Sequence, residues 1–309
     1  MRIGIIGSGA FGCALAHTFS KKNEIIMWSY LEEEANNINN SHNCLTLQNI
    51  KLDSSIKATT NLEEVVNNSE LLVLVTPSDT IRNMCIEIKK YYNNQQILLA
   101  SKGMENDKLL TDVIKEELNI DASVIMGPSF AEEIGDDLPT FVELSGNKNI
   151  IEYLETDNFK ILFNNDYVGL QVGGALKNVV TVASGIVEGL DYKVNTSSYI
   201  ITEGLKEIKE IGIKLGAKES TFYGLSGLGD LYGTSLSSKS RNKRAGILLG
   251  QGKKLEEIHS EVGSTIEGLD TVKDAFYIIN KYNLDCPLIL NLYKIIYEDM
   301  DSKNIINIK

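Results

Sequence analysis

The chain is poor in the residues that build metal sites and disulfide frameworks. Its 309 residues include only four cysteines and three histidines. The cysteines lack C-x-x-C spacing, which argues against zinc and disulfide motifs and predicts buried thiols in a reducing compartment. The histidines share no motif, so we assign none to catalysis and expect no metal site. These residues are Cys13, Cys44, Cys85, Cys286, His17, His42 and His259.

Long apolar runs and positive charge are also lacking. No stretch reaches the roughly 18 uninterrupted apolar residues of a membrane span, and the opening MRIGIIGSG predicts a strand rather than a cleavable signal. We therefore expect a cytoplasmic protein without membrane insertion. The net charge of −12 argues against nonspecific nucleic-acid binding but permits a local basic pocket for an anionic substrate. With 43% hydrophobic residues, the chain can bury a core large enough for two domains.

A glycine-rich stretch near the N-terminus, IGIIGSGAFGCALAHTF, raises the question of nucleotide binding. Residues 3–6 are predicted as a buried strand and residues 10–19 as a helix. Between them, Gly7 permits a tight turn, Gly9 lets the backbone approach a pyrophosphate, and Gly12 lets the helix lie close to the strand. This context favours a dinucleotide site, although G-x-G-x-x-G also occurs in methyltransferases and in structural turns.

A second apolar strand is expected at residues 24–30, EIIMWSY, where a dinucleotide-binding fold meets the adenosine ribose. The acid that usually ends this strand is missing, and Tyr30 stands in its place. No arginine marks a 2′-phosphate. The Tyr30 ring either stacks on adenine or covers a sheet edge, and both interpretations stay open. The polar stretch at residues 36–43 is predicted as a loop.

The first half of the chain repeats an apolar strand followed by a helix, at residues 71–84, 96–105 and 121–135. This alternation predicts an α/β fold with a doubly wound, mainly parallel sheet. In such sheets, ligands bind beyond the carboxyl ends of the strands. Three loops are expected to converge there, namely Thr76-Pro77-Ser78, Ser101-Lys102-Gly103 and Gly127-Pro128-Ser129.

After about residue 170 the pattern changes. Residues 173–190 and 197–216 have a helical period and many small residues, and no strong strand follows them. We therefore predict a dinucleotide-binding domain at residues 1–170 and an all-helical domain at residues 171–309.

The helical domain contains polar residues that need an explanation. Lys177 lies inside an otherwise apolar helix, next to Asn178. An ammonium group there must be exposed, paired or used in chemistry. Further along, Arg241 and Asn242 beside hydroxyl groups can clamp a phosphate, because a guanidinium matches two phosphate oxygens. The alternative is a solvated basic helix start, since further lysines and an arginine surround Arg241.

Five motifs follow one another over nearly the whole chain: GSGAFG, SKGME, GPSFAEE, GGALKN and GLSGLGDLYGT…SRN. In this order and at these separations they resemble the NAD(P)-dependent glycerol-3-phosphate dehydrogenases of the bacterial type. The resemblance implies a Rossmann domain, a helical substrate domain, and NAD(H) or NADP(H) as cofactor. It further implies interconversion of dihydroxyacetone phosphate and sn-glycerol 3-phosphate for phospholipid synthesis, and it leaves a homodimer open.

The resemblance also implies roles for individual residues. The catalytic group comprises the proton-transferring Lys177 together with Lys102, Asp230 and Thr234. Substrate contacts are implied for Lys102, Gly127, Ser129, Lys177, Asn178, Asp230, Ser240, Arg241 and Asn242. Cofactor contacts are implied for Gly7, Gly9, Ala10, Phe11, Gly12, Tyr30, Lys102, Ala131, Arg241, Thr265 and Glu267.

Two positions depart from the family pattern. Ala10 stands where Ser or Asn is common, so one hydroxyl contact to the pyrophosphate is expected to be lost. Tyr30 replaces a His or Arg near the adenosine ribose, which puts a preference for NADPH in doubt.

The expected chemistry depends on the protonation of Lys177. A lysine can donate a proton in one direction and accept it in the other if burial and a second cation lower its pKa. Lys102 is expected to supply that second charge, and Asp230 to hold the Lys177 head group.

Two alternatives remain at this stage. A β-hydroxyacid dehydrogenase or ketopantoate-type reductase shares the architecture and an inward-facing lysine. A non-catalytic NAD(H)-binding redox sensor would use the glycine turn, but it would not need Lys177, Asp230 and Arg241 together.

We predict that NADH is accepted at least as well as NADPH. Tyr30 and the acidic residues 32–34 offer no cation to a 2′-phosphate and present it with negative potential. Parallel steady-state assays with dihydroxyacetone phosphate, followed at the nicotinamide absorbance band, test this. A preference for NADPH above about 100-fold, or roughly 2.7 kcal/mol, would contradict it and point to Lys21, Lys22 or Arg241 as the phosphate partner.

Overall fold

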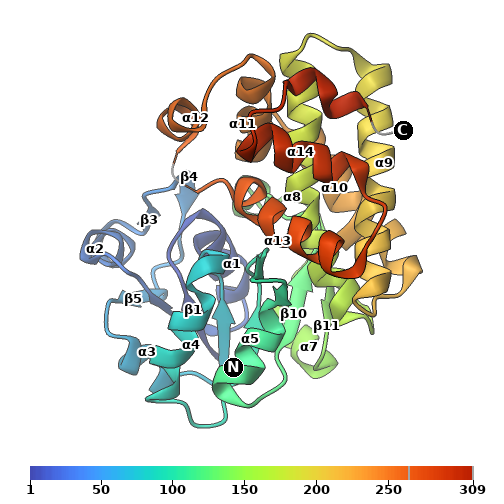
Figure 1. Ribbon diagram of the computed structural model, residues 1–309. Helices are drawn as coiled ribbons and strands as arrows, with labels where there is room; N and C mark the ends of the chain where they lie inside the picture. The colour runs from blue at the N-terminus through green and yellow to red at the C-terminus, as the bar shows by residue number, and fades with distance from the viewer. Residues whose placement is uncertain (264, 308–309) are drawn as a thin grey trace. The chain divides into compact units, whose positions relative to one another are not determined.

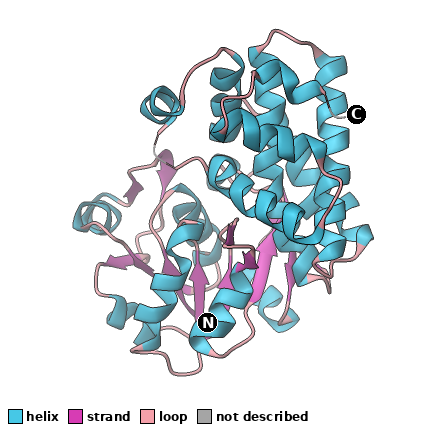
Figure 2. Ribbon diagram, viewed as in Figure 1, coloured by secondary structure: helices cyan, strands magenta, loops and turns pink. Residues whose placement is uncertain are grey.

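The computed structural model describes residues 1–263 and 265–307 (Figure 1). The chain forms two compact units. The first comprises Met1–Ser101 and Leu110–Tyr167, and the second Lys102–Leu109 and Val168–Lys309. Strands dominate the centre of the first unit, and the second is helical apart from a short hairpin of β8 (Met104–Glu105) and β9 (Lys108–Leu109) (Figure 2).

An eight-stranded sheet forms the centre of the first unit, in the order β12-β11-β10-β7-β6-β1-β2-β5. Every neighbouring pair is parallel except β10 and β11. The prediction of a mainly parallel sheet is therefore confirmed. The strands are β1 (Arg2–Ile6), β2 (Glu24–Trp28), β5 (Lys57–Thr59), β6 (Leu71–Leu74), β7 (Gln96–Leu99), β10 (Ser123–Met126), β11 (Thr140–Ser145) and β12 (Phe159–Phe163).

The central strands read as continuous apolar runs because both faces of the sheet are covered. All residues of β6 and β10 are buried, as are four of the five in β1, which is typical of parallel strands between helices. A small ribbon of β3 (Asn43–Cys44) and β4 (Leu47–Lys51) lies outside this sheet. The helices of this unit are α1 (Ala10–Ser20), α2 (Glu32–Ser41), α3 (Leu62–Asn67), α4 (Ile81–Lys89), α5 (Leu110–Leu118), α6 (Ala131–Gly135) and α7 (Ile151–Leu154).

The loop predicted at residues 36–43 is wrong for most of its length. Residues 36–41 belong to α2, which ends at His42 in a left-handed conformation with φ of 54°. Asparagine is a weak helix former, but α2 buries Ala35 and Ile38 against the core of the unit. Burial of one apolar face therefore outweighs the local preference.

The second unit is built around α8 (Tyr167–Gly189), whose residues 168–187 are all buried. By length and composition α8 is long and apolar enough to cross a membrane, yet its apolar window is 100% buried within the structure. Its buried side chains share one apolar core with those of the other helices, so α8 is the core helix of this unit (Figure 1). The other helices are α9 (Val194–Lys214), α10 (Asp230–Leu236), α11 (Arg241–Gly250), α12 (Leu255–Val262), α13 (Glu267–Tyr282) and α14 (Pro287–Tyr297).

Helices α8 and α11 touch backbone to backbone. A Cβ atom added at Gly185 would lie 2.3 Å from the Lys243 carbonyl oxygen, and one added at Gly246 would lie 2.1 Å from the Val182 carbonyl oxygen. Real Cβ atoms do not approach carbonyl oxygens this closely, so only glycine permits this contact.

Candidate functional site

The glycine-rich turn between β1 and α1 is shaped to receive a phosphate. Gly7 has a φ of 125°, and a Cβ at Gly12 would lie 2.1 Å from the Gly7 carbonyl oxygen, so the helix lies close against the turn. Gly9 is the N-cap residue of α1 and provides no side-chain cap, and a Cβ there would meet nothing within 4 Å. Open space in front of uncapped helix amides fits a pyrophosphate. Ala10 and Phe11 form the start of the helix.

The segment after β2, which the sequence predicts to lie near the adenosine ribose, carries an exposed aromatic residue and an acidic run. Tyr30 is 80% exposed and contacts Trp28 edge to face, with 6.3 Å between ring centroids. Sequence reasoning gave no individual role to Glu34, which lies in the first turn of α2 and accepts a 2.6 Å hydrogen bond from Ser8 Oγ. In the sequence, Glu34 was visible only as a member of the acidic run at residues 32–34.

The loops after β6, β7 and β10 begin at one edge of the sheet, because these strands are adjacent and parallel. Gly127 follows β10 with a φ of 139°, and its carbonyl oxygen accepts a 3.0 Å hydrogen bond from Ser129 Oγ. Ala131 begins α6 two residues later. This edge is the ligand-binding edge of a parallel sheet.

Two lysines share one buried carboxylate in the second unit. Lys177 Nζ lies 2.5 Å from Asp230 Oδ1, and Lys102 Nζ lies 2.7 Å from Asp230 Oδ2. Thr234 Oγ1 accepts a 2.8 Å hydrogen bond from Lys177 Nζ. Asp230 is 1% exposed and Lys177 is 6% exposed. The four residues predicted as catalytic therefore meet in one cluster.

Three parts of the chain position this cluster. Lys177 projects from the middle of α8, and Asp230 and Thr234 lie one turn apart at the start of α10, where residues four apart share a face. A π-helical turn, Leu225–Gly229, leads directly into α10 at Asp230. Lys102 comes from the segment 102–109, which follows β7 and belongs to the second unit.

The charges of the cluster set the protonation of Lys177. Burial lowers the pKa of Lys177 to about 8, opposed by Asp230 and assisted by Lys102. Burial works to raise the pKa of Asp230, but the two ammonium groups hold it below its usual value. The carboxylate therefore stays ionised while Lys177 can exchange a proton close to neutral pH.

A second polar group joins α8, α11 and α13. Asn178 Nδ2 donates a 2.8 Å hydrogen bond to Glu267 Oε2, and Asn242 Oδ1 accepts a 2.9 Å hydrogen bond from Gly268 N. Burial raises the pKa of Glu267, while the positive charges of the cluster lysines act in the opposite direction. The cluster lysines and this carboxylate therefore influence each other's protonation.

The start of α11 carries the remaining predicted phosphate ligands. Ser240 Oγ accepts a 3.3 Å hydrogen bond from Lys243 N and so caps the helix. Arg241 is exposed, and Nη1 donates a 3.4 Å hydrogen bond to the carbonyl oxygen of Thr265, which is also exposed. A guanidinium has five N–H donors, so Arg241 keeps donors for an anion. Lys243 pairs with Glu188 at 3.1 Å instead.

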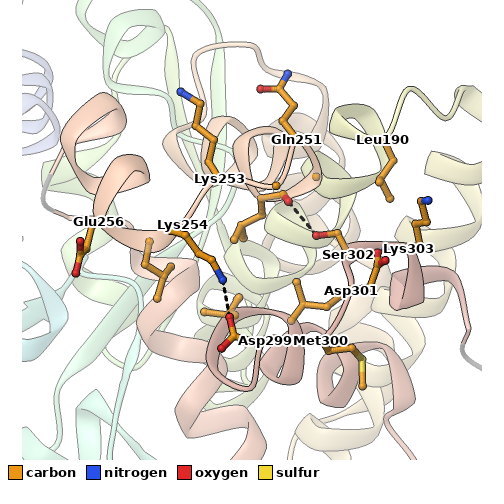
Figure 3. Close-up of a pocket in the computed structure, with 16 residues that line it drawn as sticks. Leu190, Gln251, Lys253, Lys254, Glu256, Asp299, Met300, Asp301, Ser302 and Lys303 are labelled. Atoms are coloured by element: carbon orange, nitrogen blue, oxygen red, sulfur yellow. Dashed lines mark hydrogen bonds and ion pairs between the residues drawn. The ribbon is translucent and has the colours of Figure 1, made fainter.

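A separate cavity of about 680 Å³ lies at the other end of α11 (Figure 3). Its lining includes apolar side chains such as Leu249 and Ile296, but none of the residues predicted for the site. Lys254 Nζ pairs with Asp299 at 2.6 Å (Figure 3), and Lys253 pairs with Glu261. Because these two cations are already paired, we assign no ligand to this cavity.

Comparison with known proteins identifies relatives along the whole chain. Residues 2–151 match the family described as NAD-dependent glycerol-3-phosphate dehydrogenase N-terminus, and residues 166–307 match its C-terminus. Glycerol-3-phosphate dehydrogenase [NAD(P)+] of Fusobacterium nucleatum subsp. nucleatum is 41% identical over 99% of this chain and 96% of its own length. The protein of that name from Clostridium botulinum (strain Eklund 17B / Type B) is 39% identical over 98% and 94%.

Solved structures give the same result. The crystal structure of glycerol-3-phosphate dehydrogenase from Coxiella burnetii superimposes with a TM-score of 0.95 at 30% identity, covering 99% of this chain and 97% of that one. A ketopantoate reductase of the PanE/ApbA family from Ralstonia eutropha gives a TM-score of 0.66 at 13% identity, with 99% of each chain covered. At that identity the second likeness concerns the fold alone.

We predict that Asp230→Asn strongly destabilises the protein. The substitution keeps the shape of the side chain but leaves two ammonium groups in the cluster without their carboxylate, a change that typically costs about 3–5 kcal/mol. Chemical denaturation measures the loss. The matched control is Asp121→Asn, which breaks the 2.8 Å pair with Lys115 at the exposed surface, where the loss should be close to the error of the measurement. Equal losses in the two variants would contradict the role given to Asp230.

Proposed function

Because the chain belongs to the NAD-dependent glycerol-3-phosphate dehydrogenase family, we propose a role for each polar residue of the site in that reaction. The chain is an NAD(P)-dependent oxidoreductase that interconverts dihydroxyacetone phosphate and sn-glycerol 3-phosphate. The observation that supports the assignment of roles is the buried Asp230 carboxylate between Lys177 and Lys102. The product supplies phospholipid synthesis, and we place the protein in the cytoplasm.

The proton of the reaction is assigned to Lys177. Reduction adds a hydride to C2 of dihydroxyacetone phosphate and a proton to the carbonyl oxygen, and bound NADH or NADPH supplies the hydride. Lys177 donates the proton, and in the reverse direction it accepts the proton of the C2 hydroxyl. Asp230 and Thr234 hold its head group by the contacts seen in the structure. Lys102 adds a second positive charge, which stabilises the developing alkoxide.

The phosphate of the substrate is assigned to the start of α11. Arg241 supplies the charge, and its fork of donors matches two phosphate oxygens. Among residues 1–263 and 265–307, no acceptor pairs with Asn242 Nδ2, so this amide is available beside Arg241. Ser240, Asn178, Gly127 and Ser129 complete the proposed substrate contacts.

The dinucleotide is assigned to the first unit. The turn at Gly7, Gly9 and Gly12 would hold the pyrophosphate, with Ala10 and Phe11 beside it. Further proposed cofactor contacts are Tyr30, Lys102, Ala131, Arg241, Thr265 and Glu267. The division near residue 170 is part of this proposal, with most of the dinucleotide contacts before it and most of the substrate contacts after it. Lys102, Gly127 and Ser129 precede residue 170 and are nevertheless assigned to the substrate, whereas Arg241, Thr265 and Glu267 follow it and are assigned to the cofactor. Lys102 contacts Asp230 of the second unit.

The assembly is a separate proposal. We infer a homodimer from the family resemblance, and light scattering of the purified protein tests this.

Lys177→Ala and Arg241→Ala should impair different steady-state constants. Lys177→Ala removes a proton donor needed in the transition state, so kcat should fall by about 10²-fold or more while NADH binding is retained. Arg241→Ala removes a contact made in both ground and transition states, so KM for dihydroxyacetone phosphate should rise steeply. Some kcat is lost too, because phosphate binding energy positions the carbonyl. Lys209→Ala, which removes a lysine paired at the surface with Glu219, should change neither constant.

Dihydroxyacetone, which lacks the phosphate, separates the two roles. It should react poorly with the parent enzyme and be nearly indifferent to Arg241→Ala, yet it should still depend on Lys177. Near-normal turnover of Lys177→Ala would remove this residue as proton donor. If Arg241→Ala impaired the steady-state constants equally for both substrates, the role of Arg241 would be reassigned from binding the phosphate to binding the cofactor or supporting the scaffold.

We predict opposite pH profiles for the two directions of the reaction. Reduction requires protonated Lys177, so its kcat/KM should fall as the pH rises through about 8, the pKa of Lys177 in the free protein. Oxidation requires the neutral amine, so its kcat/KM should rise over the same interval. Steady-state rates in both directions between about pH 6 and 10 measure the two profiles. Parallel profiles, or an unchanged transition in Lys177→Ala, would assign the proton to another group.

A further inference from the structure

The adenosine end of the dinucleotide site raises a question that the family assignment leaves open, namely what distinguishes NAD(H) from NADP(H). In many dinucleotide-binding folds, an acid at the end of the second strand accepts a hydrogen bond from the ribose 2′-hydroxyl. In this chain β2 ends at Trp28 and is followed by Ser29 and Tyr30. A role for any residue at this strand end depends on the proposed dinucleotide site.

The first turn of α2 brings a carboxylate to the glycine-rich turn instead. Ser8 lies between Gly7 and Gly9 and is only 6% exposed. Its Oγ donates a 2.6 Å hydrogen bond to Glu34 Oε2. This contact spans 26 residues of sequence and holds the Glu34 carboxylate against the turn that receives the pyrophosphate.

The Glu34 carboxylate retains capacity for a ligand. Its other oxygen, Oε1, accepts no hydrogen bond from any described residue, and no described lysine or arginine forms an ion pair with it. Glu34 is half-buried, whereas Glu32 and Glu33 on the same turn are exposed. Glu34 is therefore the acid of this run that is fixed beside the cofactor turn.

We propose that Glu34 determines the cofactor preference of this enzyme by accepting hydrogen bonds from the adenosine ribose hydroxyls of NAD(H). A carboxylate is an acceptor only, so it suits a pair of hydroxyl donors. A 2′-phosphate carries negative charge and no strong donor, and with no cation paired to Glu34 it meets uncompensated repulsion. Glu34, on helix α2, thus supplies the hydrogen-bond acceptor that the end of β2 lacks.

Direct titration of the protein with NADH and with NADPH, followed by their fluorescence in the absence of substrate, tests this proposal. The parent should bind NADH at least about 10-fold more tightly than NADPH. Glu34→Gln keeps the size of the side chain and removes the charge, so the ratio of the two dissociation constants should shift toward NADPH by about 10-fold. Glu34→Lys should invert the preference. An order of magnitude is the size expected for one well-placed contact of this kind.

The matched control is Glu33→Gln, which makes the same change of charge one residue away on the exposed side of the helix. It should move the ratio by less than about 2-fold, which is under 0.5 kcal/mol. If both glutamine variants shift the ratio equally, the effect is the general field of the acidic run and the proposal is wrong. An unchanged ratio in Glu34→Gln or an unaltered preference in Glu34→Lys would also overturn it. Because binding is measured without dihydroxyacetone phosphate, failure of the proposed proton transfer at Lys177 would leave this result intact.

Discussion

The arrangement of the site depends on a single buried carboxylate that neutralises only one of two ammonium groups. Asp230 is 1% exposed and touches both Lys177 and Lys102, so the cluster keeps a net positive charge out of water. Such a surplus is costly in an apolar interior. Burial lowers the pKa of Lys177, and the charge of Lys102 assists it. The surplus positive charge would also favour the anionic substrate proposed above. The same electrostatics would therefore serve both the proposed proton transfer and the proposed substrate recognition.

The sequence predicted the elements whose signals are local. The glycine spacing identified the first turn, and apolar runs identified the central parallel strands, because strands buried on both faces carry an unbroken apolar pattern. The Asn-rich half of α2 was missed, since its buried contacts through Ala35 and Ile38 lie elsewhere in the chain. Strands β11 and β12 were missed for a related reason. β12 is the edge strand and β11 lies next to it, and both carry exposed apolar residues such as Phe141 and Leu162, which blur the alternation of apolar and polar residues.

The charged residues of the site likewise divide into those with a local sequence signal and those whose contacts depend on tertiary packing. Lys177 stood out as an ammonium in an apolar helix, whereas its pairing with Asp230 was expected only through the family resemblance, because the packing of α8 against α10 that creates it has no local sequence signal. Glu34 was visible only as part of an acidic run, and its contact with Ser8 spans 26 residues. No sequence pattern pointed to Glu207 either. It is a buried acid of α9 whose oxygens accept hydrogen bonds from Leu288 N and Ile289 N at the start of α14, and burial raises its pKa to about 7.

The glycine contact between α8 and α11 fixes the distance between two helices that carry site residues. Lys177 lies on α8 and Arg241 on α11, and the two helices meet where Gly185 and Gly246 leave no side chain between the backbones. A spacing set by side chains can relax when a rotamer changes, whereas one set by two main chains in contact has no such freedom. The distance between Lys177, the proposed proton donor, and Arg241, the proposed phosphate ligand, is thus set by two main chains in contact, and it would suit a ligand whose carbonyl and phosphate are separated by a matching length.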